Sequence, residues 1–116
     1  MKKSHFKDIH LDPLVAEGFV NFAIGSFTHF TDAPINCSVS IIKLEKGSTP
    51  YHNHEQSNQH EIIFALSGCG ILKTDDKKEE VREGDIMCFS PKENHQLECP
   101  DASIVIASIH INAMGE

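Results

Sequence analysis

The sequence predicts an all-β protein, either a sandwich or a barrel. Short runs of apolar and β-branched residues recur along most of the 116-residue chain, and residues typical of turns separate them. Helical patterns are scarce: the one candidate is a short helical turn over residues 10–18, "HLDPLVAEG", where Pro13 limits the length. We therefore expect strands to build nearly the whole protein.

Seven runs mark the expected strands. They cover residues 19–27, 37–45, 61–66, 70–74, 85–90, 95–98 and 103–112. Turn residues at 32–34, 46–48, 75–76 and 83–84 separate several of them. The charged stretch 74–85, "TDDKKEEVREGD", joins two runs. Its mixed charges indicate a solvated hairpin connection that is protected from edge-to-edge pairing.

Length, charge and cysteine content narrow the class of protein. A chain of 116 residues without internal repeats or a linker fits one compact domain. The net charge of −7 and the single arginine, Arg82, argue against nucleic acid and anionic membranes as partners. No run approaches the roughly 20 apolar residues that span a bilayer, and no signal-peptide core is visible, so a cytoplasmic location is expected. The four cysteines form no CxxC pair and are expected to be free thiols, with Cys88 in the core.

Three histidines and a carboxylate stand out as candidate metal ligands. His52 and His54 are separated by one residue, so an extended chain presents both imidazoles on the same face. Glu61 opens the next apolar run, and His95 follows a strand and a proline turn. Three imidazoles and one carboxylate suit Fe, Mn, Zn, Ni or Cu better than Ca or Mg. The alternative is that these histidines are ordinary surface residues.

Two groups of residues follow one another in a characteristic order. The first is Gly47, His52, His54, Glu61 and Gly68, and the second is Gly84, Asp85, Pro91 and His95. This order resembles the cupin superfamily, in particular its small cupin 2 type conserved barrels, over about residues 36–112. The resemblance implies a double-stranded β-helix, that is, a jelly-roll (RmlC-like) barrel of two antiparallel sheets.

The resemblance also implies a metal site and a domain plan. It places His52, His54, Glu61 and His95 around one divalent transition metal inside the mouth of the barrel. It implies a single domain over residues 1–116, with an N-terminal extension and strands in 1–35 and the conserved barrel core in 36–112. Departures from the family pattern affect the loops: Gly47 and His52 are one residue closer than usual, and Lys92 stands where the family has glycine.

A longer loop than the family usually has, residues 55–60 ("EQSNQH"), separates His54 from Glu61. It leaves two arrangements open, because a bulge that shifts the strand by one residue would make His60 the ligand in place of Glu61. Glu61 is the favoured ligand. Gln56, Gln59 and His60 are candidates for contacts at the mouth of the pocket, or for a plain polar loop.

Several other residues are expected in the pocket, and three histidines have no expected role. The expected apolar wall consists of Ile41, Ile63, Phe64, Met87, Phe89 and Leu97. Lys92 is either a solvated lysine or a cation near the mouth that attracts an anionic substrate. His5, His10 and His110 lie outside the two motifs, and the sequence assigns them no function.

Three functions fit these features, and the fold alone does not choose among them. The first is a metal-dependent enzyme of the dioxygenase, isomerase or lyase type, acting on a small oxygenated or carboxylated metabolite. The second is a non-catalytic module that binds or senses a sugar or an organic acid. The third is a structural barrel with a vestigial site. A homodimer that pairs through residues 19–27 is also expected.

Overall fold

A computed structural model describes residues 1–32 and 35–113. It contains one short 3-10 turn, η1 (Phe6–Asp8), and seven strands: β1 (Asp12–Pro13), β2 (Val20–Phe30), β3 (Ile35–Ser48), β4 (His60–Thr74), β5 (Lys78–Arg82), β6 (Ile86–Phe89) and β7 (His95–Ala113). All strand pairings are antiparallel, so the all-β prediction is confirmed. Over these residues, no helix has the length and apolar character needed to cross a bilayer.

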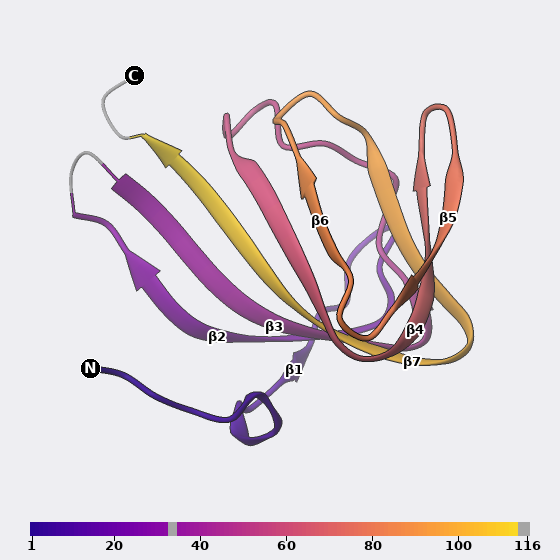
Figure 1. The fold of residues 1–116 in the computed structure, drawn as a ribbon, viewed down its shortest axis with the longest axis horizontal. Coiled ribbons are helices and arrows are strands. Elements are labelled where there is room, and N and C mark those ends of the chain that lie inside the picture. The colour runs from indigo at the N-terminus through magenta and orange to yellow at the C-terminus, as the bar shows by residue number, and fades with distance from the viewer. Residues whose placement is uncertain (33–34, 114–116) are drawn as a thin grey trace.

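The sheet is strongly bent, and its central strand, β7, connects the two halves of the sheet. The strand order is β1-β2-β3-β7-β4-β5. β6 pairs with residues 61–64 of β4, the part of that strand that does not pair with β5. Figure 1 shows β7 curving from the wall that holds β2 and β3 to the wall that holds β4 and β5. Because β7 pairs with both β3 and β4, hydrogen bonds connect the two walls continuously.

Two pairs of predicted strands are single strands in the structure. Runs 61–66 and 70–74 form β4, and runs 95–98 and 103–112 form β7. Gly68, between the two runs that form β4, lies at a bulge: its φ is +80°, and the β4–β7 register shifts beside it. A Cβ at this position would lie 2.0 Å from the carbonyl oxygen of Ser103, so the close approach of the two strands requires glycine.

The N-terminal segment differs from its prediction. The helical turn expected over residues 10–18 is wrong, because β1 occupies Asp12–Pro13 and a non-helical turn follows. The segment packs on β2 at Gly25, where a Cβ would lie 2.0 Å from the carbonyl oxygen of His10. Residues 14–19 then form a loop closed by a 2.9 Å hydrogen bond from Leu14 N to Phe22 O. The hairpin expected in residues 74–85 is present, with β5 as its second strand.

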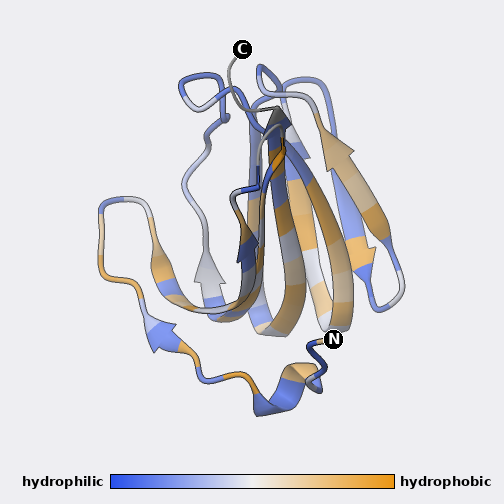
Figure 2. Ribbon diagram, turned by 90° about the vertical axis from the view of Figure 1, so that its left-hand side faces the viewer, coloured by the Kyte–Doolittle hydropathy of each residue, from blue (hydrophilic) through white to orange (hydrophobic). Residues whose placement is uncertain are grey.

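The core lies between the two walls of the bent sheet. Figure 2 shows hydrophobic and hydrophilic bands alternating along the long strands, which is the period-two pattern of a half-buried sheet. Leu44, Ile104 and Cys99 are at most 1% exposed. The expected burial of Cys88 is wrong: Met87 and Phe89 point inward from β6, so the residue between them points outward.

Shortening the most deeply buried core side chain should destabilise the protein strongly. Leu44→Ala is expected to lower the free energy of unfolding by about 2–5 kcal/mol, because the side chain is 0% exposed and leaves a cavity. Ile86→Ala, at a residue 64% exposed, serves as the control and should cost less than about 1 kcal/mol. Urea unfolding at fixed metal content measures both. Equal losses would contradict the assignment of the core.

Candidate metal centre

The four predicted ligands come together in space. One donor atom from each of His52, His54, Glu61 and His95 lies within 4.8 Å of every other. Glu61 and His95 are only 5% and 2% exposed, and the other two are half-buried. The first two histidines come from the loop after β3, and the other two residues begin β4 and β7. Residues more than forty positions apart in the chain thus converge on one point.

Backbone pairing holds the loop histidines in place. His52 and His95 form an isolated antiparallel bridge, with N–O distances of 3.0 and 2.8 Å between their main chains. His54 N donates to Pro91 O at 3.0 Å, which anchors the next part of the loop to the turn before β7. The loop and the start of β7 are therefore fixed relative to each other, although only the latter belongs to the continuous sheet.

Backbone carbonyls orient two of the imidazoles. His52 Nδ1 lies 2.6 Å from Pro50 O, and His95 Nδ1 lies 3.1 Å from Glu93 O. Because a carbonyl can only accept, each Nδ1 carries the proton, and the neutral ring then presents the lone pair of Nε2 to the cluster. This hydrogen-bonding pattern is the usual one for histidines that bind metal through Nε2.

Glu61 lies at the centre of the cluster. Its Oε1 is 3.1 Å from His54 Nε2 and 2.7 Å from His95 Nε2, while Oε2 accepts a 2.6 Å hydrogen bond from Ser108 Oγ. Burial would raise the pKa of this carboxyl, but the contacts with His110, His54, His95 and Ser108 outweigh burial and hold the pKa well below its usual range. Glu61 is therefore ionised at neutral pH.

The donor set fits a cation. In the tautomer fixed by Glu93, His95 Nε2 has no proton, yet it faces the carboxylate oxygen of Glu61 at 2.7 Å. Two acceptors at that distance repel each other unless a proton or a metal ion lies between them. The residues present thus suit a divalent transition metal bound by nitrogen and oxygen donors.

Two residues beside the cluster were not assigned a role from the sequence. Ser108 is 0% exposed, and its hydroxyl holds Oε2 of Glu61. His110 is the cross-strand neighbour of Glu61, and its Nε2 lies 3.1 Å from the same Oε2. That nitrogen is buried and makes no hydrogen bond within the described part of the chain. The alternation of residues 104, 106, 108 and 110 on the inner face of β7 was the sequence signal that could have identified both.

A mostly apolar cavity of about 250 Å³ opens onto the cluster. The N-terminal part of the chain lines it with Leu14, Phe19, Phe22 and Ile24. The strands of the barrel line it with Ile42, Ile63, Leu97 and Ile106. The polar lining residues are the four candidate ligands, His110 and Thr49, whose hydroxyl already accepts a hydrogen bond from Leu97 N. Every lining polar group that remains for a ligand therefore belongs to the cluster or adjoins it.

Some of the residues predicted to form the apolar wall line the cavity, and others do not. Ile63 and Leu97 line the cavity, whereas Ile41, Phe64 and Met87 do not. Ile42 lines the cavity in place of Ile41, because neighbouring residues on a strand face opposite sides. Phe89 lies behind the cluster, where its ring stacks on His95 with the centroids 4.1 Å apart.

The residues predicted at the mouth of the pocket do not line the cavity. Glu61 is buried and His60 is exposed, so the strand presents Glu61 to the cluster, and the arrangement with His60 as ligand is not the one observed. Gln56 is exposed, Gln59 is half-buried, and neither lines the cavity. Lys92 is likewise exposed and does not line the cavity. None of residues 55–60 is among the residues that line the cavity, so the inserted loop adds polar surface outside it.

One family of known proteins matches most of the chain. A family profile described as "Cupin domain" matches residues 40–110. The chain belongs to the cupin family. The profile covers both halves of the metal motif, from before His52 to His110. It begins after β2, so the N-terminal wall of the cavity lies outside the region that defines the family.

Solved structures share this cupin's jelly-roll fold. The polyketide cyclase RemF from Streptomyces resistomycificus matches with a TM-score of 0.80 and 22% identity, over 97% of this chain and 81% of that one. A predicted oxalate decarboxylase from Thermotoga maritima matches with a TM-score of 0.77 and 18% identity, over 92% and 96%. KdgF from Halomonas sp. matches with a TM-score of 0.72 and 14% identity, over 95% and 92%. No curated protein matches the sequence.

Metal affinity of this cupin should fall in acid. Burial lowers the pKa of His52 despite the hydrogen bond to Pro50, so the ring stays neutral to lower pH than a free histidine, whose pKa is about 6.5. Protons and metal compete for the imidazole lone pairs, so affinity should be constant above about pH 7 and decrease below about pH 6. Competitive chelator titrations across this range measure the effect. An affinity independent of pH would contradict histidine ligation.

Proposed function

We propose that this cupin is a metal-dependent enzyme that acts on a small molecule bound in the cavity. The observation that carries the proposal is the convergence of four donor atoms within 4.8 Å at an apolar cavity of about 250 Å³. The ligands would be His52, His54, Glu61 and His95, holding one ion of Fe, Mn, Ni, Zn or Cu. When bound, such an ion supplies Lewis-acid polarisation of a carbonyl or hydroxyl group, or activation of dioxygen.

The residues around the ion have separate tasks in this proposal. His52 and His95 are held by backbone carbonyls, so their Nε2 atoms stay directed at the ion. Ser108 holds one oxygen of Glu61 and leaves the other for the ion. The apolar wall orients the substrate and excludes water from the reacting end. His110 is the titratable group of the lining that is not a proposed ligand, so it is the candidate to move a proton.

The printed names of the structural neighbours span a cyclase and a predicted decarboxylase, so they favour no single reaction for this chain. Dioxygenase, isomerase and lyase chemistry all remain within the proposal. The second candidate function is metal-dependent binding or sensing without turnover. The scarcity of proton-transfer groups in the cavity favours it, since His110 alone is available for that task among the described residues of the lining.

Metal analysis followed by turnover assays tests the proposal. Protein purified without added metal, or reloaded after chelation, is expected to hold close to one transition-metal ion per chain. Loss of substrate or uptake of oxygen with a panel of small organic acids, sugars and thiols would then separate an enzyme from a binding module. A protein that takes up no metal after reloading would overturn both candidate functions and leave the vestigial barrel.

A further inference from the structure

We infer that the ligand of this cupin has an apolar body of about one six-membered ring and carries its oxygen donors at one end only. The inference rests on the proposed function, because the oxygen end is assigned to the metal. It is carried by three properties of the cavity: its size, its chemistry, and the part of its lining that the N-terminal segment contributes.

The size of the cavity limits the body of the ligand. An engineered cavity of roughly 150 Å³ in another protein accommodates benzene. The cavity of about 250 Å³ in this cupin therefore holds one substituted ring, with room for the group that reaches the metal. It lies below the roughly 300–1,000 Å³ of sites for drug-sized ligands.

The chemistry of the wall limits where polar groups can lie. Eight of the fourteen lining residues are apolar, and the polar ones gather at the metal cluster. A hydroxyl or carboxylate held against these apolar side chains would thus lose its contact with water and gain no hydrogen bond from them, at a cost of about 1–3 kcal/mol. Sugars, with polar groups on every side, and dicarboxylates are therefore disfavoured.

The charges around the cavity also favour a ligand whose polar groups lie at one end. A metal ion at the cluster would place positive charge at one end of the cavity, which suits a single carboxylate or phenolate. Among the described residues that line the cavity there is no lysine or arginine, so a second anionic group would meet no cation from them. Lys92, the cation that the sequence offered for this task, is exposed and outside the cavity.

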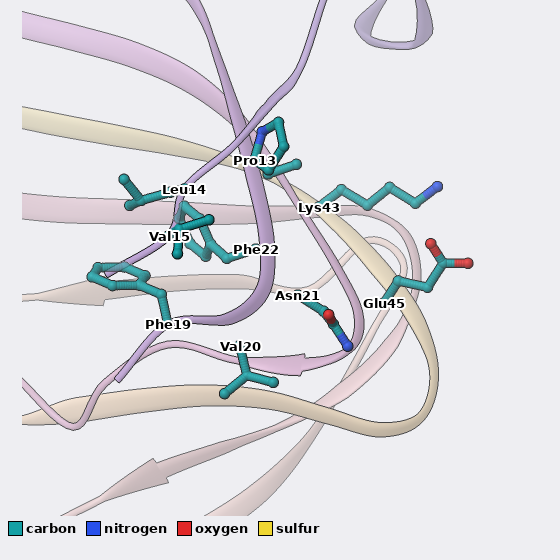
Figure 3. Close-up of a pocket in the computed structure, with 10 residues that line it drawn as sticks. Pro13, Leu14, Val15, Phe19, Val20, Asn21, Phe22, Lys43 and Glu45 are labelled. Carbon is teal, nitrogen blue, oxygen red and sulfur yellow. The ribbon is translucent and has the colours of Figure 1, made fainter. Parts of the chain in front are cut away.

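The N-terminal loop lines part of the cavity. Leu14, Phe19 and Phe22 line the cavity and also line a shallow groove on the outside of the molecule. Figure 3 shows their side chains grouped together on one side of that groove, with Val15 beside them. Val15 lines the groove but not the cavity, and it is 93% exposed. We therefore assign Phe19 a part in selecting the ligand, and Val15 none.

Three carboxylates with the same metal-binding group test the inference on Co²⁺-loaded protein. Benzoate has the apolar ring, acetate lacks it, and terephthalate adds a second carboxylate at the far end. Benzoate is expected to bind at least tenfold more tightly than either, by calorimetry, and to change the visible spectrum of the bound Co²⁺. If acetate or terephthalate binds as tightly as benzoate, the ligand class is overturned while the metal site stands. If the protein retains no Co²⁺, that result contradicts the proposed function, and the inference that rests on it is overturned as well.

Two variants test the wall. Phe19→Ala is expected to weaken benzoate binding about tenfold and to leave Co²⁺ affinity unchanged, since Phe19 lines the cavity but is not among the ligands. Val15→Ala is expected to change neither affinity by more than about twofold. Unchanged benzoate binding in Phe19→Ala, with the melting temperature showing a folded protein, would overturn the part assigned to Phe19.

Discussion

Replacing His95 by alanine is expected to abolish stoichiometric metal binding. The side chain is 2% exposed, its ring centroid lies 4.5 Å from that of His52, and its Nε2 is 2.7 Å from Glu61. Loss of a group that only supports a ligand costs roughly 10–100-fold in metal affinity, and loss of a ligand should cost more. Metal content by elemental analysis and affinity by chelator competition measure the change.

A matched histidine serves as the control for this variant. His60→Ala removes an exposed imidazole that precedes Glu61 in the chain but lies outside the cluster. Its metal content and affinity should equal those of the unmodified protein. Equal losses in both variants, or full metal content in folded His95→Ala, would contradict the assigned ligand set. His95→Gln, which keeps more of the buried volume beside Phe89, separates loss of a ligand from loss of packing.

Replacing Ser108 by alanine is expected to weaken metal binding about 10–100-fold without removing a ligand. The hydroxyl donates to Oε2 of Glu61 at 2.6 Å from a fully buried position. Without it, the carboxylate loses the partner that keeps Oε1 directed at His54 and His95. Calorimetric titration with Zn²⁺ and the visible spectrum of the Co²⁺ form report affinity and ligand geometry separately.

Ser103→Ala provides the comparison on the same strand. Ser103 lies on β7 at an odd-numbered position, on the face opposite to Ser108. Metal affinity in this variant should stay within about twofold of the unmodified protein. If Ser108→Ala also stays within that range while folded, Ser108 does not position Glu61.

The sequence was sufficient to predict the class of fold and the grouping of His52, His54, Glu61 and His95, for different reasons. Alternating apolar runs predicted strands because burial on one face of a sheet imposes a period of two. The grouping of His52 and His95, forty-three positions apart, did not follow from their spacing. It came from the resemblance to cupins, and the bridge between the two backbones supplies its physical basis.

The errors follow from limits of local patterns. Placing Cys88 in the core and Ile41 in the cavity wall were both one-residue errors in strand phase, which exchange one face of a strand for the other. Dividing β4 into runs 61–66 and 70–74 was an error of a different kind, since the strand continues through a bulge at Gly68, the kind of position that glycine often marks within a strand. His110 was missed because its partner, Glu61, is adjacent only across a long-range strand pairing.

The position of β7 between β3 and β4 has a consequence for when the metal can bind. His52, His54 and Glu61 precede β5 in the chain, but His95 and Ser108 belong to the last strand described. During synthesis on the ribosome, the first three would emerge while the centre of the sheet was still vacant, and non-local pairings of this kind form slowly. Metal capture is thus expected only after β7 has inserted. An ion that binds only the folded state stabilises that state by RT ln(1 + [M]/Kd), where [M] is the concentration of free metal. Metal binding would then stabilise the protein only after folding is complete.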